Sequence, residues 1–382
     1  MLFIKNGHIV TMTGEELDGG SLLIGDDGKI IAIGKDLQAP ENAEVIDAEG
    51  HLVTPGIVEA HSHVGLHGTL LRWEGNEVNE RIDPLTPQLR VIDGINPFDE
   101  AFHNAVSHGV TTVCVAPGSA NVVGGSVAAI KTVGKCVDDM IVKYPVAMKC
   151  AFGENPKSVY GQNGKTPVTR MATAALFRDL LFRAQRYLRD KDAGKDPSFD
   201  MKLEAMIPVL RREIPLKAHA HRADDILTAI RIAREFNLRL TLDHCTDGAL
   251  IADVLADAGY PAIVGPSFGN KSKPELLNKD FHTVAALHEA GLTVCITTDA
   301  PVTPIEHLPL CAGLAAKAGL ATNAAWHAIT RNPAAVLGIE DRVGTLAVGL
   351  DGDLVIWQDD PLTVIGALPS HTVINGKIVY EA

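Results

Sequence analysis

The sequence lacks an excess of basic residues and lacks any long apolar run. Its 382 residues include 34 Lys or Arg and 47 Asp or Glu, which gives a net charge of −13. Binding to a phosphate backbone needs clustered basic side chains, so we expect no nucleic-acid partner. No apolar stretch approaches the roughly 20 residues that cross a bilayer, so we expect no membrane partner. The first residues resemble a strand entering a turn rather than a secretory leader.

Paired cysteines are also missing. The six cysteines, at positions 114, 136, 150, 245, 295 and 311, show no Cys-x-x-Cys spacing. Most lie in apolar runs typical of buried strands, which favours free thiols in a reducing compartment. We therefore expect a cytoplasmic protein.

The two ends of the chain share one character, that of short strands separated by turns. Asn6-Gly7 near the start and Asn375-Gly376 near the end are strong hairpin signals. An isolated hairpin is only marginally stable in water. We therefore predict that residues 1–54 and 344–382 pair into one small β-sandwich domain, and that residues 55–343 form a continuous insert.

The insert alternates apolar, strand-like runs with helical patterns, which is typical of an α/β fold with a parallel sheet. Helices are predicted at 99–108, 173–189, 223–235, 249–258 and 283–290. Strands are predicted at 56–59, 111–116, 127–131, 146–152, 216–219, 239–244, 262–265 and 294–298. Eight such strands in about 290 residues predict a closed (β/α)8, TIM-like barrel.

His61 and His63 form the most informative motif. They follow the apolar run at residues 54–58, at the mouth of the first predicted barrel strand. Side chains on a strand alternate faces with a period of two, so both imidazoles point the same way and can reach one metal ion.

Histidines and acids recur at the carboxyl ends of the other strands, where barrel enzymes place their catalytic groups. The predicted metal ligands are His61, His63, Glu154, His219, His244 and Asp299. Imidazole with carboxylate suits a divalent metal and favours Zn²⁺, in one or two ions, with Mn²⁺, Co²⁺ or Fe²⁺ as alternatives. His221 shares a strand face with His219, so either or both can point inward.

This set of residues suits hydrolysis. A divalent metal lowers the pKa of water from about 16 toward 7, and a neighbouring carboxylate can take the proton and pass it to a leaving nitrogen. Asp299 is the predicted general base and acid, and His244 is the second predicted catalytic residue, a ligand or a contact to the substrate oxygen. Two metals need an anionic bridge, for which Glu154 is the first candidate and a carboxylated Lys149 the alternative.

These residues resemble the metal-dependent amidohydrolase superfamily. The resemblance covers the whole chain and rests on residues 53–63, on Thr297-Thr298-Asp299-Ala300-Pro301, and on residues 331–338 and 344–355. Within the superfamily the chain is most similar to imidazolonepropionase-related amidohydrolases, a group that includes prolidase-like dipeptidases. The resemblance implies that His61, His63 and Asp299 bind the more buried metal, and that Glu154 bridges to a second metal on His219 and His244.

The expected activity is therefore hydrolysis of a C–N bond in a small cyclic amide, imide, amide or dipeptide-like substrate, by an enzyme that is a homo-oligomer. A heterocycle deaminase is one alternative, although the glutamate that such enzymes carry three residues after the fifth-strand histidine is Arg222 here. A non-catalytic, metal-stabilised barrel scaffold is another. Cations near the mouth that can bind a substrate carboxylate are Arg72, Arg81, Arg90 and Lys157.

Overall fold

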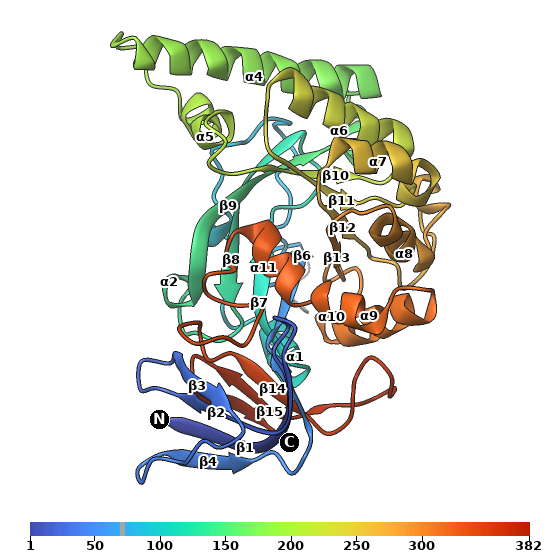
Figure 1. The fold of residues 1–382 in the computed structure, drawn as a ribbon. Coiled ribbons are helices and arrows are strands. Elements are labelled where there is room, and N and C mark those ends of the chain that lie inside the picture. The colour runs from blue at the N-terminus through green and yellow to red at the C-terminus, as the bar shows by residue number, and fades with distance from the viewer. Residues whose placement is uncertain (69–72) are drawn as a thin grey trace.

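The computed structural model describes residues 1–68 and 73–382, arranged around two sheets (Figure 1). The predicted cation Arg72 lies outside the described residues. One sheet contains β1 (Leu2–Val10), β2 (Glu16–Ile24), β3 (Ile30–Gly34), β4 (Glu44–Asp47), β5 (Leu52–Pro55), β14 (Leu354–Trp357), β15 (Pro369–Ile374) and β16 (Lys377–Glu381). The other contains β6 (Ile57–Ser62), β7 (Val110–Val115), β8 (Val123–Lys131), β9 (Ile141–Ala151), β10 (Leu216–Ala220), β11 (Leu240–His244), β12 (Ala262–Val264) and β13 (Val294–Ile296).

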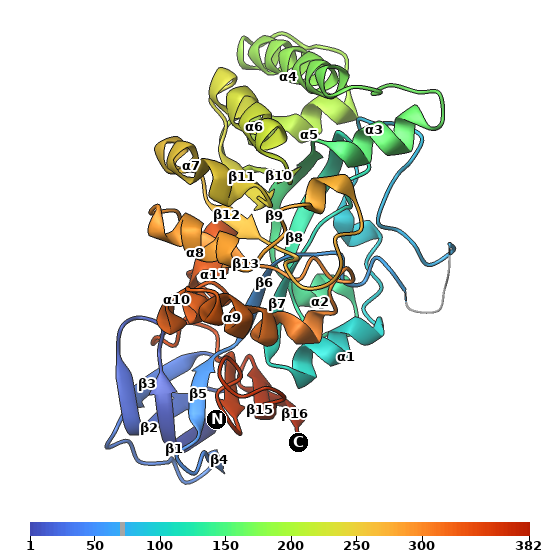
Figure 2. The ribbon, with the colours of Figure 1, turned by 90° about the vertical axis from the view of Figure 1, so that its right-hand side faces the viewer.

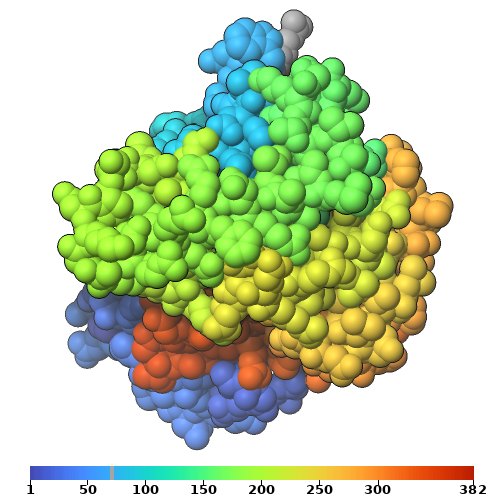
Figure 3. All heavy atoms as spheres, turned by 90° about the horizontal axis from the view of Figure 1, so that it is seen from above, coloured from blue at the N-terminus to red at the C-terminus, as the bar shows by residue number. Residues whose placement is uncertain are grey.

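Most helices follow strands of the second sheet. The α-helices are α1 (Glu100–Ser107), α2 (Val137–Met140), α3 (Glu154–Gly161), α4 (Arg170–Asp192), α5 (Met201–Leu210), α6 (Ala223–Glu235), α7 (Ala252–Ala258), α8 (His282–Glu289), α9 (Leu308–Lys317), α10 (Thr322–His327) and α11 (Arg331–Leu337). Short 3₁₀ helices are η1 (Val91–Asp93), η2 (Gly248–Ile251), η3 (Pro274–Leu276) and η4 (Ile305–His307). The five predicted helices correspond to α1, α4, α6, α7 and α8. Figure 2 shows α6, α7 and α8 stacked along the outside of β10–β13, and Figure 3 shows α4 covering one end of the molecule.

The sheet of the chain ends joins the two termini, as the sequence predicts. Its order is β16-β15-β14-β5-β1-β2-β3, with β4 also paired to β1, and β5 meets β14 in antiparallel register. Ile30 of β3 and Val373 of β15 lie far apart in this order yet belong to one buried cluster with Leu22 and Leu354. The sheet therefore wraps around its own core, as a sandwich does. The domain division at residues 54 and 344 stays a prediction.

The second sheet contains all eight predicted barrel strands in chain order, β6 to β13. It differs from the predicted all-parallel arrangement at β8, which runs antiparallel to both β7 and β9. The reason is the length of the connections, because only residues 116–122 link β7 to β8. A parallel crossover needs about a dozen residues or more, so the chain can only turn back.

The two edges of this sheet, β6 and β13, approach each other and nearly close the barrel. The Thr297 hydroxyl donates to the His61 carbonyl at 2.7 Å, and the His63 amide donates to the Ala300 carbonyl at 2.7 Å. Glu59 of β6 accepts from both the amide and the hydroxyl of Thr298. These bonds bring the carboxyl ends of the first and last strands together, so residues far apart in the sequence share one rim.

Buried charges connect the two sheets. Lys131 at the end of β8 contacts Asp353 at 2.5 Å and Asp351 at 3.0 Å, and all three side chains are at most 5% exposed. Arg342 adds hydrogen bonds to Asp351. Burial alone raises the pKa of Asp351, but the hydrogen bonds from Arg342 and the charge of Lys131 hold that pKa below its usual range. Asp351 is therefore ionised and depends on its cations.

Replacing Lys131 with methionine should lower the free energy of unfolding by about 3 kcal/mol, because it leaves two buried carboxylates with less compensation. Urea denaturation followed by circular dichroism measures the change. The exposed Lys35→Met variant is the matched control and should stay within about 0.5 kcal/mol of the parent. Equal midpoints for Lys131→Met and the parent would contradict this assignment.

Candidate metal centre

The histidines and Asp299 predicted from the sequence meet at the carboxyl ends of the barrel strands. His61 lies on β6, His219 on β10 and His244 at the end of β11, and Asp299 follows β13. One ligand atom from each of His61, His244 and Asp299 lies within 4.8 Å of the others, as in a metal-binding group. The same holds for His219, His221 and His244. His244 belongs to both groups, so the two positions adjoin.

The first group is arranged around Asp299. Its Oδ1 lies 3.4 Å from Nε2 of His61 and 3.3 Å from Nε2 of His63. His63 Nδ1 is 2.7 Å from the Ala116 carbonyl, which can only accept, so Nδ1 carries a proton. His61 Nδ1 faces Asp243 Oδ2 at 2.8 Å, an arrangement that turns Nε2 toward Asp299.

Two residues of the centre have strained backbones that aim their side chains. His244 has φ 75° and Asp299 has φ 53°, in the left-handed region that non-glycine residues seldom adopt. Strict alternation along β11 would send His244 to the face opposite Asp243. The left-handed turn instead brings both inward, and His244 Nδ1 donates to the Gly265 carbonyl at 2.6 Å. Such strain costs about 1–3 kcal/mol and is typical of functional sites.

The structure distinguishes the two candidates for the bridging group. Lys149 is fully buried on β9, and its Nζ lies 3.1 Å from His61 Nε2 and 4.0 Å from Asp243 Oδ2. Burial lowers the pKa of Lys149, which favours the neutral amine. Glu154 begins α3, and its backbone amide donates to Glu275 at 3.1 Å. Among the described residues, neither metal-binding group includes the Glu154 carboxylate, so its ligand role stays a prediction.

Four charged residues of the centre were not predicted from the sequence: Glu59, Lys217, Asp243 and Glu275. Glu59 and Lys217 stand two residues before His61 and His219 on the same strands, so the period of two could have placed them inside the barrel. Lys217 Nζ contacts the Ala60 carbonyl at 2.9 Å and Asp243 Oδ1 at 3.3 Å. Glu275 lies in η3 after β12, and no local pattern marks it.

The donor set fits a divalent cation. His244 Nε2 and Asp299 Oδ1 are buried and have no hydrogen-bond partner among the described residues. Burial lowers the pKa values of His61, His219 and His244, the last to about 3, so their imidazoles are neutral near pH 7. Burial alone raises the pKa of Asp299, but contacts with His61 and His63 hold it well below its usual value. Neutral imidazole and ionised carboxylate are the forms that bind metal.

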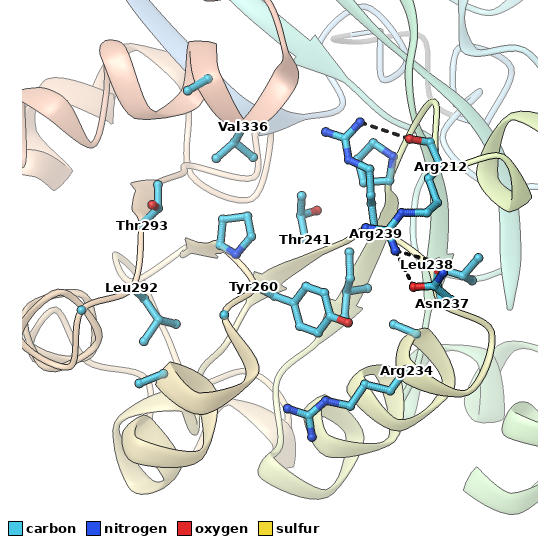
Figure 4. A pocket seen from close by; sticks show the side chains of 18 residues that line it. Arg212, Arg234, Asn237, Leu238, Arg239, Thr241, Tyr260, Leu292, Thr293 and Val336 are labelled. Carbon is cyan, nitrogen blue, oxygen red and sulfur yellow. Dashed lines mark hydrogen bonds between the residues drawn. The ribbon is translucent and has the colours of Figure 1, made fainter.

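Two cavities differ in their relation to this centre. A pocket lined by Arg212, Arg234, Arg239 and Tyr260 lies at the amino ends of β10–β13, away from the histidines (Figure 4). A second cavity is lined by His63, Ala300, Pro301 and Glu306, and so adjoins the centre directly. Barrel enzymes work at the carboxyl ends of their strands, so we associate the second cavity with function.

Comparisons with known proteins agree with this geometry. A family profile described as "Amidohydrolase family" matches residues 212–380. The crystal structure of an amidohydrolase from Thermotoga maritima MSB8 is 38% identical, with full coverage of both chains and a TM-score of 0.96. The chain belongs to the amidohydrolase family. This finding confirms the resemblance and the enzyme class, a hydrolase, that the sequence predicts.

Two other relatives of this amidohydrolase are more distant or much longer. Amidohydrolase tasK from Hapsidospora irregularis is 32% identical over 376 residues, which is 90% of this chain but only 38% of tasK. An imidazolonepropionase from Klebsiella pneumoniae is 24% identical over 380 residues, 92% of this chain and 89% of that enzyme.

Within the described residues, we find no helix with the length and apolarity to cross a membrane.

Asp243→Asn should weaken metal binding about 10- to 100-fold, because the carboxylate that orients His61 is lost while the ligand itself remains. Competition with a chromogenic chelator measures the affinity. Asp253→Asn, an exposed acid on α7, is the matched control and should bind like the parent. Equal affinity in Asp243→Asn and the parent would show that His61 does not need this partner.

Proposed function

We propose that this amidohydrolase is a metal-dependent hydrolase that cleaves a C–N bond in a small cyclic amide, imide or dipeptide-like substrate. The observation that carries the proposal is the convergence of His61, His63, His244 and Asp299, in which His244 Nε2 and Asp299 Oδ1 are buried without a hydrogen-bond partner among the described residues. The preference for a cyclic substrate rests on the likeness to imidazolonepropionase over most of both chains. We further infer that the nearly closed sheet is a variant of the (β/α)8 barrel in which β8 is reversed.

His61, His63 and Asp299 would hold one cation, and His219 and His244 a second, with zinc favoured by the imidazole and carboxylate donors. A bound divalent metal lowers the pKa of water and polarises a carbonyl group. We infer that Lys149, rather than Glu154, would supply the anionic ligand between the two positions, after its neutral amine adds CO₂ and releases a proton to form a carbamate. Its position beside His61 Nε2 supports this choice.

Asp299 performs the proton transfers in this proposal. Its carboxylate is ionised, and Oδ1 accepts no hydrogen bond from the described residues. That oxygen can take a proton from the attacking water and return it to the leaving nitrogen. His244 Nε2 likewise has no hydrogen-bond partner among the described residues, and a ligand atom of His244 lies within 4.8 Å of one of Asp299. His244 can therefore act as a ligand or contact the substrate oxygen.

Asp299→Asn should lower turnover by about a hundredfold or more while the metal stays bound, because the amide cannot accept the proton. The metal-loaded protein is assayed on N-acyl amino acids, hydantoins, imidazolones and Xaa-Pro dipeptides, and metal content is determined by elemental analysis. Near-normal turnover in this variant would remove Asp299 as the base.

The same assay needs a metal-free control. Parent protein stripped with a chelator should lose the activity, and zinc, manganese or cobalt should restore it. Full activity in the stripped protein would end the proposal of metal-dependent hydrolysis.

Lys149→Met should abolish detectable turnover, whereas Glu154→Gln should keep it within about twofold, because only Lys149 lies among the buried ligand atoms. Steady-state rates of the two variants on the substrate found above decide the question. The reverse order of effects would return the bridge to Glu154.

A further inference from the structure

Glu275 is a buried carboxylate that faces two histidines of the centre. It lies in η3, and its side chain is 1% exposed. Its Oε1 is 3.7 Å from Nε2 of His219 and 3.7 Å from Nε2 of His221. A carboxylate buried to this degree normally has a full set of partners, since an unsatisfied charged group in the interior is costly.

The two oxygens of Glu275 differ in this respect. Oε2 accepts a hydrogen bond from the Glu154 amide at 3.1 Å. Oε1 accepts none from the described residues, although the Lys273 ammonium lies 2.5 Å away without the alignment of a hydrogen bond. Lys273 is itself anchored by Asn155 Oδ1 at 3.1 Å. Oε1 thus has an ion pair with Lys273 but no hydrogen-bond donor among the described residues.

The neighbouring imidazoles are oriented to share a ligand position with that oxygen. His221 Nδ1 contacts the Thr246 hydroxyl at 2.7 Å, and His244 Nδ1 donates to the Gly265 carbonyl. These bonds occupy Nδ1 in both rings. His244 Nε2 is buried and has no hydrogen-bond partner among the described residues. Ligand atoms of His219, His221 and His244 lie within 4.8 Å of one another.

We propose that His221 and Glu275 are ligands of the second cation, in addition to His219 and His244. The proposal rests on the metal centre of the proposed function and adds these two residues to it. Ligand bonds to zinc of about 2.0–2.2 Å place tetrahedral ligand atoms roughly 3.3–3.6 Å apart. The 3.7 Å separations from Glu275 are close to that spacing.

Imidazole and carboxylate are both donors that suit zinc, so the two added residues fit the chemistry of the other ligands. The competing explanation is that Glu275 serves only as the counter-ion of Lys273, and this makes a different prediction.

The experiment measures cobalt binding, which does not depend on any substrate. Chelator-treated full-length chain is titrated with Co²⁺, followed by elemental analysis and by visible absorption of the bound ion. The parent should bind two ions per chain. Glu275→Gln and, independently, His221→Asn should bind one ion normally and the second at least about tenfold more weakly. Lys273→Met is the matched control and should still bind two.

Each result decides the assignment. Two ions bound with the parent's affinity and spectrum in both Glu275→Gln and His221→Asn would overturn it, as would loss of the second ion in Lys273→Met alone. A parent that binds a single ion also overturns it, yet leaves the proposed hydrolase intact with the cation at His61, His63 and Asp299. A parent that binds none removes both proposals. Far-ultraviolet circular dichroism confirms that each variant is folded, and His221→Asn carries the test if Glu275→Gln is not.

Discussion

Burial of the ligand atoms is the constraint on which the rest of the centre depends. Removing imidazoles from water lowers the pKa values of His61, His219 and His244, so these side chains are neutral and present lone pairs. Asp299 stays ionised in the same surroundings because His61 and His63 lie next to it. A cation that enters therefore meets donors already in their binding forms, and it satisfies atoms whose isolation would otherwise be costly.

Further buried charged residues lie in the barrel interior next to the metal ligands. Lys217 contacts Asp243, and Asp243 faces His61, so one chain of contacts runs from the barrel interior to the rim. Lys149 lies beside both Asp243 and His61. Among these buried groups, the Lys149 amine is the one best placed to change its own charge. Each link stands on a different strand, and the register pairs Lys217 with Lys149 and Asp243 with His219.

The sheet of the chain ends supports the centre from outside. Strands from both chain ends form it, and the buried group of Lys131, Asp351 and Asp353 attaches it to β8. Trp357 of β14 is buried as well and donates to the Thr54 hydroxyl at 2.9 Å, directly before the first barrel strand. The strand that carries His61 and His63 thus begins at a point held by the other end of the chain.

The sequence by itself determined the element types and the donor chemistry. Apolar runs located all eight barrel strands, and the period of two on a strand predicted that His61 and His63 share a face. Local patterns reach only a few residues, however, so they could not show that β8 runs in reverse or that His244 turns inward on a left-handed backbone. Only the tertiary structure decided which groups meet: Lys149 rather than Glu154 beside His61, and Glu275 beside His219. These choices depend on strand register and on loops whose paths are set by packing across the whole barrel, which no short stretch of sequence encodes.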